Sequence, residues 1–235
     1  MTQLIEFLPD SREVELGVPS PVPARTLLPD WYKESKSFYD GNTLSFDTNY
    51  SVQSTIKQCI PVLDSLTAGY IQPSWTEVYI EDKETDFFYA FPNGPTPIRA
   101  RSVESFQQMP IPEGFHKQVF AWERYWGIKT PPGYSTLITM PPYRDDLPFR
   151  CVTGIIDTDK HHTSGAVSFF VQKGFTGVIP IGTPLFQMIP FKRDDWKSVR
   201  HTFEQTEELQ RNRVNVRNFF VGGYKKLYWS RKSYE

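Results

Sequence analysis

The chain has 235 residues, and its 26 basic and 27 acidic side chains leave a formal net charge of −1. A balance this even provides little attraction for the phosphate backbone of nucleic acid, so nucleic-acid binding is not expected. Hydrophobic residues make up 39% of the chain and aromatic residues 15%, which is enough to fill a core and excludes a disordered protein.

The cysteines and the N-terminal residues indicate the cellular compartment of the protein. Cys59 and Cys151 form no disulfide framework, so both are expected to be reduced thiols. The segment Met1–Leu8 contains Glu6 and lacks the basic stretch of a signal peptide, so secretion by a signal peptide is not expected. No apolar run approaches the ~18 residues that a membrane helix needs. These features favour an intracellular protein without a membrane segment.

Residues 1–53 are expected to form an extended, proline-rich arm with one short helix. Residues 1–9 alternate weakly and could form a strand. Four prolines in the segment Gly17–Pro29, the last being Pro29, favour an extended path. A helix over about 31–38 is predicted to follow, with Asp30 as its cap.

Residues 54–193 are expected to form a β core. Twenty prolines and fourteen glycines interrupt long helices, which is typical of sandwiches and barrels. Residues 54–61 fit either a strand or a helix. Apolar and polar residues alternate over 76–81, and the polar turn 82–86 leads to another strand at 87–91, which predicts a hairpin. Further strands are predicted at about residues 120–130, 133–140, 151–157, 166–172, 177–180 and 184–191.

The tail, residues 194–235, has neither proline nor glycine before Gly222 and is predicted to be helical, with Asp194 or Asp195 as cap. Three apolar side chains at positions i, i+3 and i+7 would share one helix face: Trp196, Val199 and Phe203. The end of the tail is basic and aromatic and could stack on single-stranded nucleic acid. Because the whole chain is nearly neutral, we favour docking of this tail on its own domain or on a neighbouring subunit.

A local pattern covers residues 131–191. It begins with Pro131–Gly133 before a strand, continues with Gly154–Asp157, and ends in a strand that contains Gln187. This pattern resembles the β-clip fold of trimeric dUTPases and dCTP deaminases, and Ala68–Tyr70 resembles a further dUTPase segment. The resemblance implies a β-clip fold for this region. Together with the patterns above, it leads us to expect a single, mainly β domain of β-clip or jelly-roll type, with a short N-terminal helix and a helical C-terminal tail.

The segments that hold the nucleotide in those enzymes differ in this chain. No serine-rich phosphate-binding segment lies between Thr139 and Gly154, and Ile71, not an acidic residue, follows Tyr70. Catalysis is therefore not the favoured interpretation, and no cofactor is expected. An enzyme that binds or hydrolyses a nucleotide remains an alternative, and its candidate residues are Asp157, Gln187, Asp64 and Tyr70. A module that senses a nucleotide or blocks a host protein is a further alternative.

A second resemblance spans most of the chain. It rests on Pro29–Lys33, on Thr55–Asp64 with the following Gly69–Tyr70, on Pro132–Ser135 and on Gly182–Trp196. These segments resemble an uncharacterised protein family of tailed phages and some bacteria. The resemblance implies a phage origin and a location in the host cytoplasm or the virion. We therefore expect a structural or accessory phage protein that acts through assembly, with itself or with other phage proteins.

One cluster of polar residues could hold a metal ion. Asp157, Asp159 and His161 would share one face if their strand continued, and carboxylates with an imidazole can bind a divalent cation. The competing interpretation is a polar hairpin loop that begins at Asp157, because a lone aspartate at the end of an apolar strand is usually a turn former. We favour the loop, so no metal site is predicted.

Overall fold

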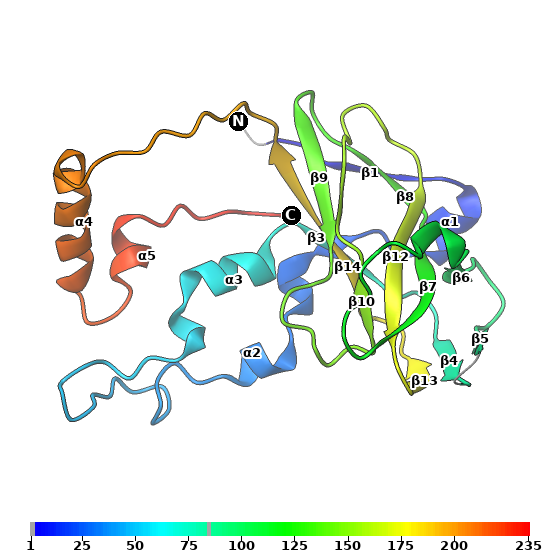
Figure 1. Cartoon of the computed structure of the whole chain (residues 1–235), viewed down its shortest axis with the longest axis horizontal. Coiled ribbons are helices and arrows are strands. Elements are labelled where there is room, and N and C mark those ends of the chain that lie inside the picture. Colours follow the sequence, from blue (N-terminus) through cyan, green and yellow to red (C-terminus); the bar gives the residue numbers. More distant parts are fainter. Residues whose placement is uncertain (1–2, 84–85) are drawn as a thin grey trace. The chain divides into compact units, whose positions relative to one another are not determined.

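The computed structural model describes residues 3–83 and 86–235. The chain is mainly β, as the sequence predicts, with antiparallel sheets and with helices near the C-terminus (Figure 1). It divides into two compact units. The β unit is built from residues up to Leu27 and from Gly69–Arg193, and the helical unit from Leu28–Ala68 and Asp194–Glu235. The single-domain organisation and the β-clip or jelly-roll type stay predictions.

The strands of the described residues lie in the β unit. They are β1 (Glu6–Pro9), β2 (Val22–Pro23), β3 (Tyr70–Pro73), β4 (Val78–Asp82), β5 (Phe87–Ala90), β6 (Ile98–Ala100), β7 (Phe115–Arg124), β8 (Trp126–Lys129), β9 (Tyr134–Thr139), β10 (Phe149–Cys151), β11 (Gly154–Ile156), β12 (Gly165–Gln172), β13 (Thr176–Ile179) and β14 (Pro184–Lys192). Over the described residues they form sheets of order β10-β12-β7-β6, β11-β9-β14-β3-β2, β13-β4-β5 and β1-β8. This unit also contains helix α1 (Arg12–Gly17) and the short 3₁₀ turns η1 (Ala24–Leu27) and η3 (Glu104–Phe106).

Most predicted strands are present. The hairpin predicted from residues 76–91 is the β4–β5 pair, although residues 84–85 of its turn lie outside the described residues. The strands predicted at residues 133–140, 166–172, 177–180 and 184–191 are observed as β9, β12, β13 and β14. Two predictions merged separate strands: residues 120–130 are divided between β7 and β8, and residues 151–157 between β10 and β11.

The first residues of the chain are held in sheets. β1 pairs with β8, and β2 pairs with β3 at the edge of its sheet. An edge strand tolerates Pro23, because proline lacks the N–H that a central strand would need. Helix α1 between them is capped by Ser11, whose Oγ accepts a hydrogen bond from the Val14 N–H at 3.2 Å.

Aromatic side chains fill the core where β7 and β12 pair. Trp122 of β7 and Phe169 of β12 are fully buried, and their rings stack with centroids 4.2 Å apart. The Phe149 ring of β10 meets both of them edge-on. Burial of a phenylalanine side chain contributes about 1.5–3 kcal/mol, so this cluster is a main source of stability for the sheet.

β14 positions the candidate site. It pairs with β9 from Gln187 opposite Thr139 to Lys192 opposite Tyr134, and with β3 on its other side. The entry to β3 needs glycine, because Gly69 has φ +64° and a Cβ there would lie 2.0 Å from the Met188 carbonyl oxygen. β14 ends at Lys192, and the chain leaves the sheet at the next residue, Arg193.

The helical unit has a small core of its own. Its elements are α2 (Asp30–Glu34), η2 (Ile56–Gln58), α3 (Ile60–Thr67), η4 (Glu204–Thr206), α4 (Glu207–Arg217) and α5 (Gly223–Leu227). Of the ambiguous residues 54–61, Ile56–Gln58 form η2 and Ile60 begins α3, whereas Ser54 forms an isolated β-bridge with Phe38. Pro61 lies in the first turn of α3, where its missing N–H has no cost. Tyr32 of α2 packs against Val62 and Leu66 of α3.

The helix predicted at 31–38 is α2, but the prediction of its cap was wrong. Asp30 is the first helical residue, not the cap, and its carboxylate pairs with the Lys33 ammonium at 2.8 Å. The helix ends four residues early, because Ser35 adopts ψ 132° and its Oγ donates to the Trp31 carbonyl oxygen at 2.6 Å.

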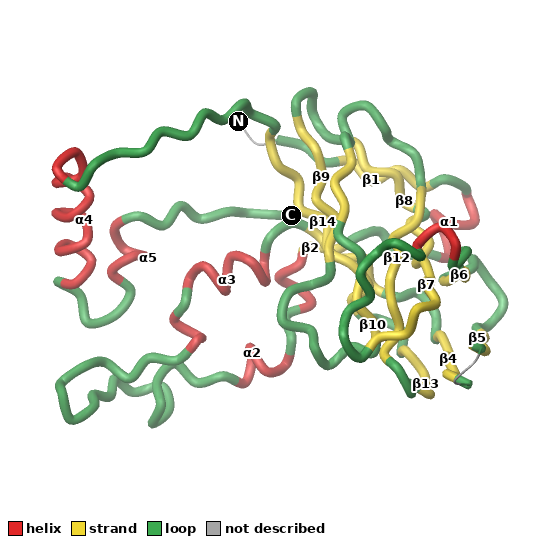
Figure 2. Tube along the Cα trace, viewed as in Figure 1, coloured by secondary structure: helices red, strands yellow, loops and turns green. Residues whose placement is uncertain are grey.

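The helix face predicted at the start of the tail was wrong. The segment from Asp194 to Thr202 has no helix, and Figure 2 shows it as a long loop after β14. Trp196, Val199 and Phe203 are 91%, 69% and 73% exposed. A short amphipathic segment is marginal unless its apolar face is covered, which explains the outcome. The first α-helix of the tail is α4. Among the described residues, no helix is long and apolar enough to cross a membrane.

Candidate functional site

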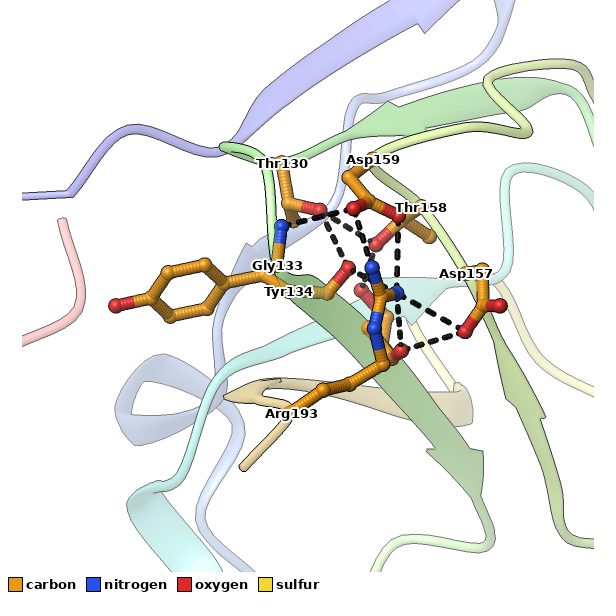
Figure 3. A network of polar contacts seen from close by, with 9 residues as sticks. Thr130, Gly133, Tyr134, Asp157, Thr158, Asp159 and Arg193 are labelled. Atoms are coloured by element: carbon orange, nitrogen blue, oxygen red, sulfur yellow. Dashed lines mark hydrogen bonds and ion pairs between the residues drawn. The ribbon is translucent and has the colours of Figure 1, made fainter. Parts of the chain in front are cut away.

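Arg193 lies at the centre of a polar network in the β unit (Figure 3). It follows β14 directly, and its backbone N–H donates to the Gly133 carbonyl oxygen at 2.8 Å. The loop after β11 brings Asp157 and Asp159 to the same place, because β11 pairs with β9 and β9 pairs with β14. Three segments far apart in the sequence therefore meet around one guanidinium group.

The guanidinium of Arg193 is held on several sides. Nη1 lies within hydrogen-bond distance of four oxygens, which share its two N–H groups: Asp157 Oδ1 at 3.0 Å, Asp159 Oδ1 at 2.9 Å, Ser135 Oγ at 2.9 Å and the Tyr134 carbonyl oxygen at 3.0 Å. Nη2 contacts the second oxygen of Asp159, so that ion pair is bidentate. Such pairs have a fixed geometry, and this one locks the end of β14 onto the loop after β11.

A layer of buried hydroxyl groups supports this network. Thr158 Oγ1 lies 2.8 Å from Thr130 Oγ1 and 2.9 Å from Thr136 Oγ1. All three threonines are nearly or fully buried. The Gly133 N–H donates to Asp159 Oδ2 at 2.8 Å, in a turn where Gly133 has φ +84°. Each polar group of the layer thus has a partner, as buried polar groups require.

The charges shift the pKa values of both carboxyl groups downward. Hydrogen bonding to Arg193 lowers the pKa of Asp159 to about 2. The hydrogen bond from Ser135 and the charge of Arg193 lower the pKa of Asp157. The same carboxylates raise the pKa of Arg193. All three groups are therefore charged at neutral pH, and neither carboxyl group is suited to act as a general base near pH 7.

The three residues weighed as metal ligands have other partners. Asp157 and Asp159 are paired with Arg193, and His161 Nε2 lies 3.0 Å from Thr163 Oγ1. The backbone turns at this point, since the His161 N–H donates to the Asp157 carbonyl oxygen at 2.9 Å. This is the hairpin loop that the sequence favours, not a continued strand. No group of three His, Cys, Asp or Glu side chains in the described residues is placed to hold a metal ion.

The residues predicted for a nucleotide enzyme do not lie close together in the β unit. Asp157 Oδ1 accepts a hydrogen bond from Ser135 Oγ at 2.7 Å, whereas Gln187 pairs with Thr139 at the other end of β9. Four residues of a strand span about 13 Å, so Asp157 and Gln187 do not lie together. Tyr70 is buried in β3 with its ring 5.1 Å from that of Phe7.

Asp64, the remaining candidate, belongs to the helical unit. Its carboxylate accepts hydrogen bonds from Trp229 Nε1 at 3.0 and 3.1 Å and pairs with Lys232 Nζ at 2.6 Å. Lys225 and Lys232 both lie within 6 Å of the Trp229 ring, at 5.7 and 5.9 Å. Asp64 therefore anchors the C-terminal segment to α3.

A cavity of about 430 Å³ lies elsewhere in the β unit. It is bounded by the loop between β9 and β10, by Phe115 of β7 and by Gln172 of β12. Arg150 lies over the Phe115 ring at 5.3 Å and is 3.7 Å from Asp145, with half of its side chain exposed. The cavity thus offers an accessible guanidinium beside an aromatic face.

Two other residues of this cavity have structural roles. Arg144 is bound by both oxygens of Asp146, with Nε and Nη2 each 2.8 Å from the nearer oxygen. Cys151 is buried, its Sγ donates to the Leu185 carbonyl oxygen at 3.2 Å, and burial raises the pKa of the thiol. A neutral, buried thiol is no nucleophile, so this cysteine is a core residue.

The helical unit exposes many large apolar side chains. On the tail they extend from Trp196 to Tyr228, and they include Val199, Phe203, Leu209, Val214, Phe220 and Tyr224. Helix α4 buries none of its residues. So many large apolar side chains exposed on one segment are candidates for contact with other molecules.

Sequence reasoning missed Arg193 and the cavity. Arg193 stands in a run of polar residues after the last strand, and only the pairing of β9 with β14 shows what it binds. The cavity residues come from β7, β10 and β12 and from the loops beside them, which are separate in the sequence. The sequence matches no model of a known protein family and no curated protein sequence.

Proposed function

We propose that this chain is a structural or accessory component of a phage assembly and acts through protein contacts rather than catalysis. The contacts are made by the tail, residues 194–235. The resemblance of Pro29–Lys33, Thr55–Asp64 and Gly182–Trp196 to a tailed-phage family supports the phage origin. The mainly β architecture is compatible with a β-clip or jelly-roll subunit.

One observation carries the proposal: the exposed apolar side chains of the tail. Trp196 is 91% exposed and stands on a segment without regular structure. Removing an indole ring from water is worth several kcal/mol at about 25 cal/mol per Å². A chain that leaves such groups in water gains this free energy when a partner covers them.

The polar network of the β unit supports the same conclusion. Asp157, the carboxylate that a nucleotide hydrolase would need, is bound to Ser135 and Arg193. Its lowered pKa makes it a weak base. The network therefore serves to fix the exit of β14, and catalysis has no suitable group there.

The test is the presence of the chain in purified particles or assembly intermediates of the phage that encodes it. Mass spectrometry should detect the wild-type chain. A variant with Trp196→Ser and Phe203→Ser should be depleted at least tenfold, since each change removes an exposed apolar contact. Ile181→Ser, at an apolar residue of the β unit that is 64% exposed, is the control and should be incorporated normally. Absence of the wild-type chain, or equal incorporation of all variants, would contradict the proposal.

The cavity beside Arg150 supports a second candidate function, the binding of a nucleotide or a similar flat anion. Arg150 can pair with a phosphate, and Phe115 can contact a base. Thermal unfolding with a panel of deoxynucleotides, with and without magnesium, tests it. A ligand at about a hundred times its dissociation constant adds about 2.7 kcal/mol of stability. The shift should vanish in Arg150→Ala, and no shift with any nucleotide would reject this function.

A further inference from the structure

Helix α4 presents charges that have no partner. Within the described part of the chain, none of its charged side chains forms an ion pair: Glu207, Glu208, Arg211, Arg213 and Arg217. This holds even for Glu207 and Arg211, which are spaced i, i+4 and could meet on the helix surface. The helix also buries none of its apolar residues.

One face of α4 is hollowed. A hollow of about 370 Å³ is lined by Phe203, Glu204, Glu207, Gln210, Arg211 and Val214. Its apolar ends, Phe203 and Val214, are 73% and 57% exposed. The opposite face turns toward α5, because the Asn212 carbonyl oxygen accepts a hydrogen bond from the Tyr228 hydroxyl at 3.4 Å, and Val216 contacts Gly223. The hollowed face is therefore free of contacts with α5.

The hollow is self-complementary in one orientation. Glu207 and Arg211 lie symmetrically about position 209, and Phe203 and Val214 about a centre half a residue earlier. A second copy of α4 placed antiparallel, with a two-fold axis across the hollow at the level of residues 208–209, brings Phe203 of each copy close to Val214 of the other. The same axis brings each Glu207 to the other copy's Arg211. A parallel copy would place like charges together, which is unfavourable.

We propose that two copies of this chain associate through antiparallel pairing of α4 across this hollow. This inference rests on the proposed function, because it names the first partner of the tail. The Phe203 ring enters the apolar end of the partner's hollow, and two symmetric Glu207–Arg211 pairs set the direction. Eleven residues span about 16 Å, so α4 alone buries less than the ~1,200 Å² of a stable interface. The exposed Trp196 and Val199 extend the contact.

A charge-swap experiment on the full chain tests the proposal. Sedimentation velocity over a range of concentrations at low salt should show a dimer for the wild type. Glu207→Arg alone and Arg211→Glu alone should each be monomeric, since each places like charges across the axis. An equimolar mixture of the two variants should restore the dimer, because both pairs are then opposite in charge. A helix unfolded by its substitution would not be rescued by mixing.

Matched controls lie on the same helix. Glu208→Arg and Arg213→Glu make the same charge changes at residues that do not line the hollow, and each should dimerise like the wild type. Raising the salt concentration toward 1 M, where the screening length falls to about 3 Å, should weaken the dimer.

A wild-type chain that stays monomeric, variants that dimerise alone, or a mixture that stays monomeric would each overturn the α4 pair. If the chain is nevertheless found in particles in a Trp196-dependent way, the proposed function stands and its tail has a different partner.

Discussion

Asp159 and Arg193 form the central ion pair of the polar network, and the Asp159 side chain is only 6% exposed. Hydrogen bonding to Arg193 lowers the pKa of Asp159 to about 2, below the ~3.9 of an unfolded aspartate. The folded chain therefore binds a proton on this group less readily than the unfolded chain. The stabilisation is complete above about pH 4 and is lost as the pH falls toward 2.

Asp159→Asn should lower the free energy of unfolding at neutral pH and should flatten its decline between about pH 4 and 2. Urea unfolding at a series of pH values measures both effects. Asp157→Asn is the control, because that side chain is 53% exposed and should change the profile less. If the free energy of unfolding declines in the same way at acid pH in Asp159→Asn and in the wild type, this ion pair does not cause the decline.

At the scale of secondary-structure elements, the approach of β3 to β14 depends on Gly69. Gly69→Ala should be more destabilising than Gly182→Ala, although both glycines have left-handed φ values, +64° and +82°. An alanine at Gly182 meets no atom within 4 Å and costs only the ~1–2 kcal/mol of the backbone conformation. At Gly69 the Met188 carbonyl must also move, which disturbs the β3–β14 pairing. Urea unfolding of the two variants checks the order, and equal losses would contradict it.

The contact between α3 and the C-terminal segment depends on Asp64. Asp64→Ala removes the acceptor for Trp229 Nε1 and the partner of Lys232, so the segment after α5 should open more often. Trypsin should then cleave at Arg231 and Lys232 faster than in the wild type. Asp40→Ala, at an exposed aspartate of the same unit, should leave the rate unchanged. Equal cleavage rates in both variants would mean that Asp64 does not hold the segment.

At the scale of the whole molecule, charge and apolar surface act together. The formal net charge is −1 and the isoelectric point about 6.4, so copies repel one another least near that pH. Light scattering should therefore report the strongest self-association near pH 6.4 and weaker association on either side. Trp196→Ser with Phe203→Ser, which changes no charge, should lower this maximum. A pH profile that the double variant leaves unchanged would assign the association to another surface.

Much of the β architecture could be predicted from the sequence, because alternation with period two is a local signal. The hairpin of residues 76–91 and the strand at β14 show this. The same locality misled at Trp196 and Val199: their spacing fits a helix, but no apolar surface covers them, and the segment has no regular structure. Spacing describes which face would be apolar, and only packing decides whether that face forms.

The mainly β class, helix α4 and the polar loop at Asp157 could be read from local sequence patterns. How those elements combine became visible only in the folded chain. Arg193 meets Asp159 across 34 residues of sequence because β9 pairs with both β11 and β14. Asp64 meets Trp229 across 165 residues. Such contacts depend on strand pairing and on long-range closure of the chain, and neither leaves a periodic trace in the sequence.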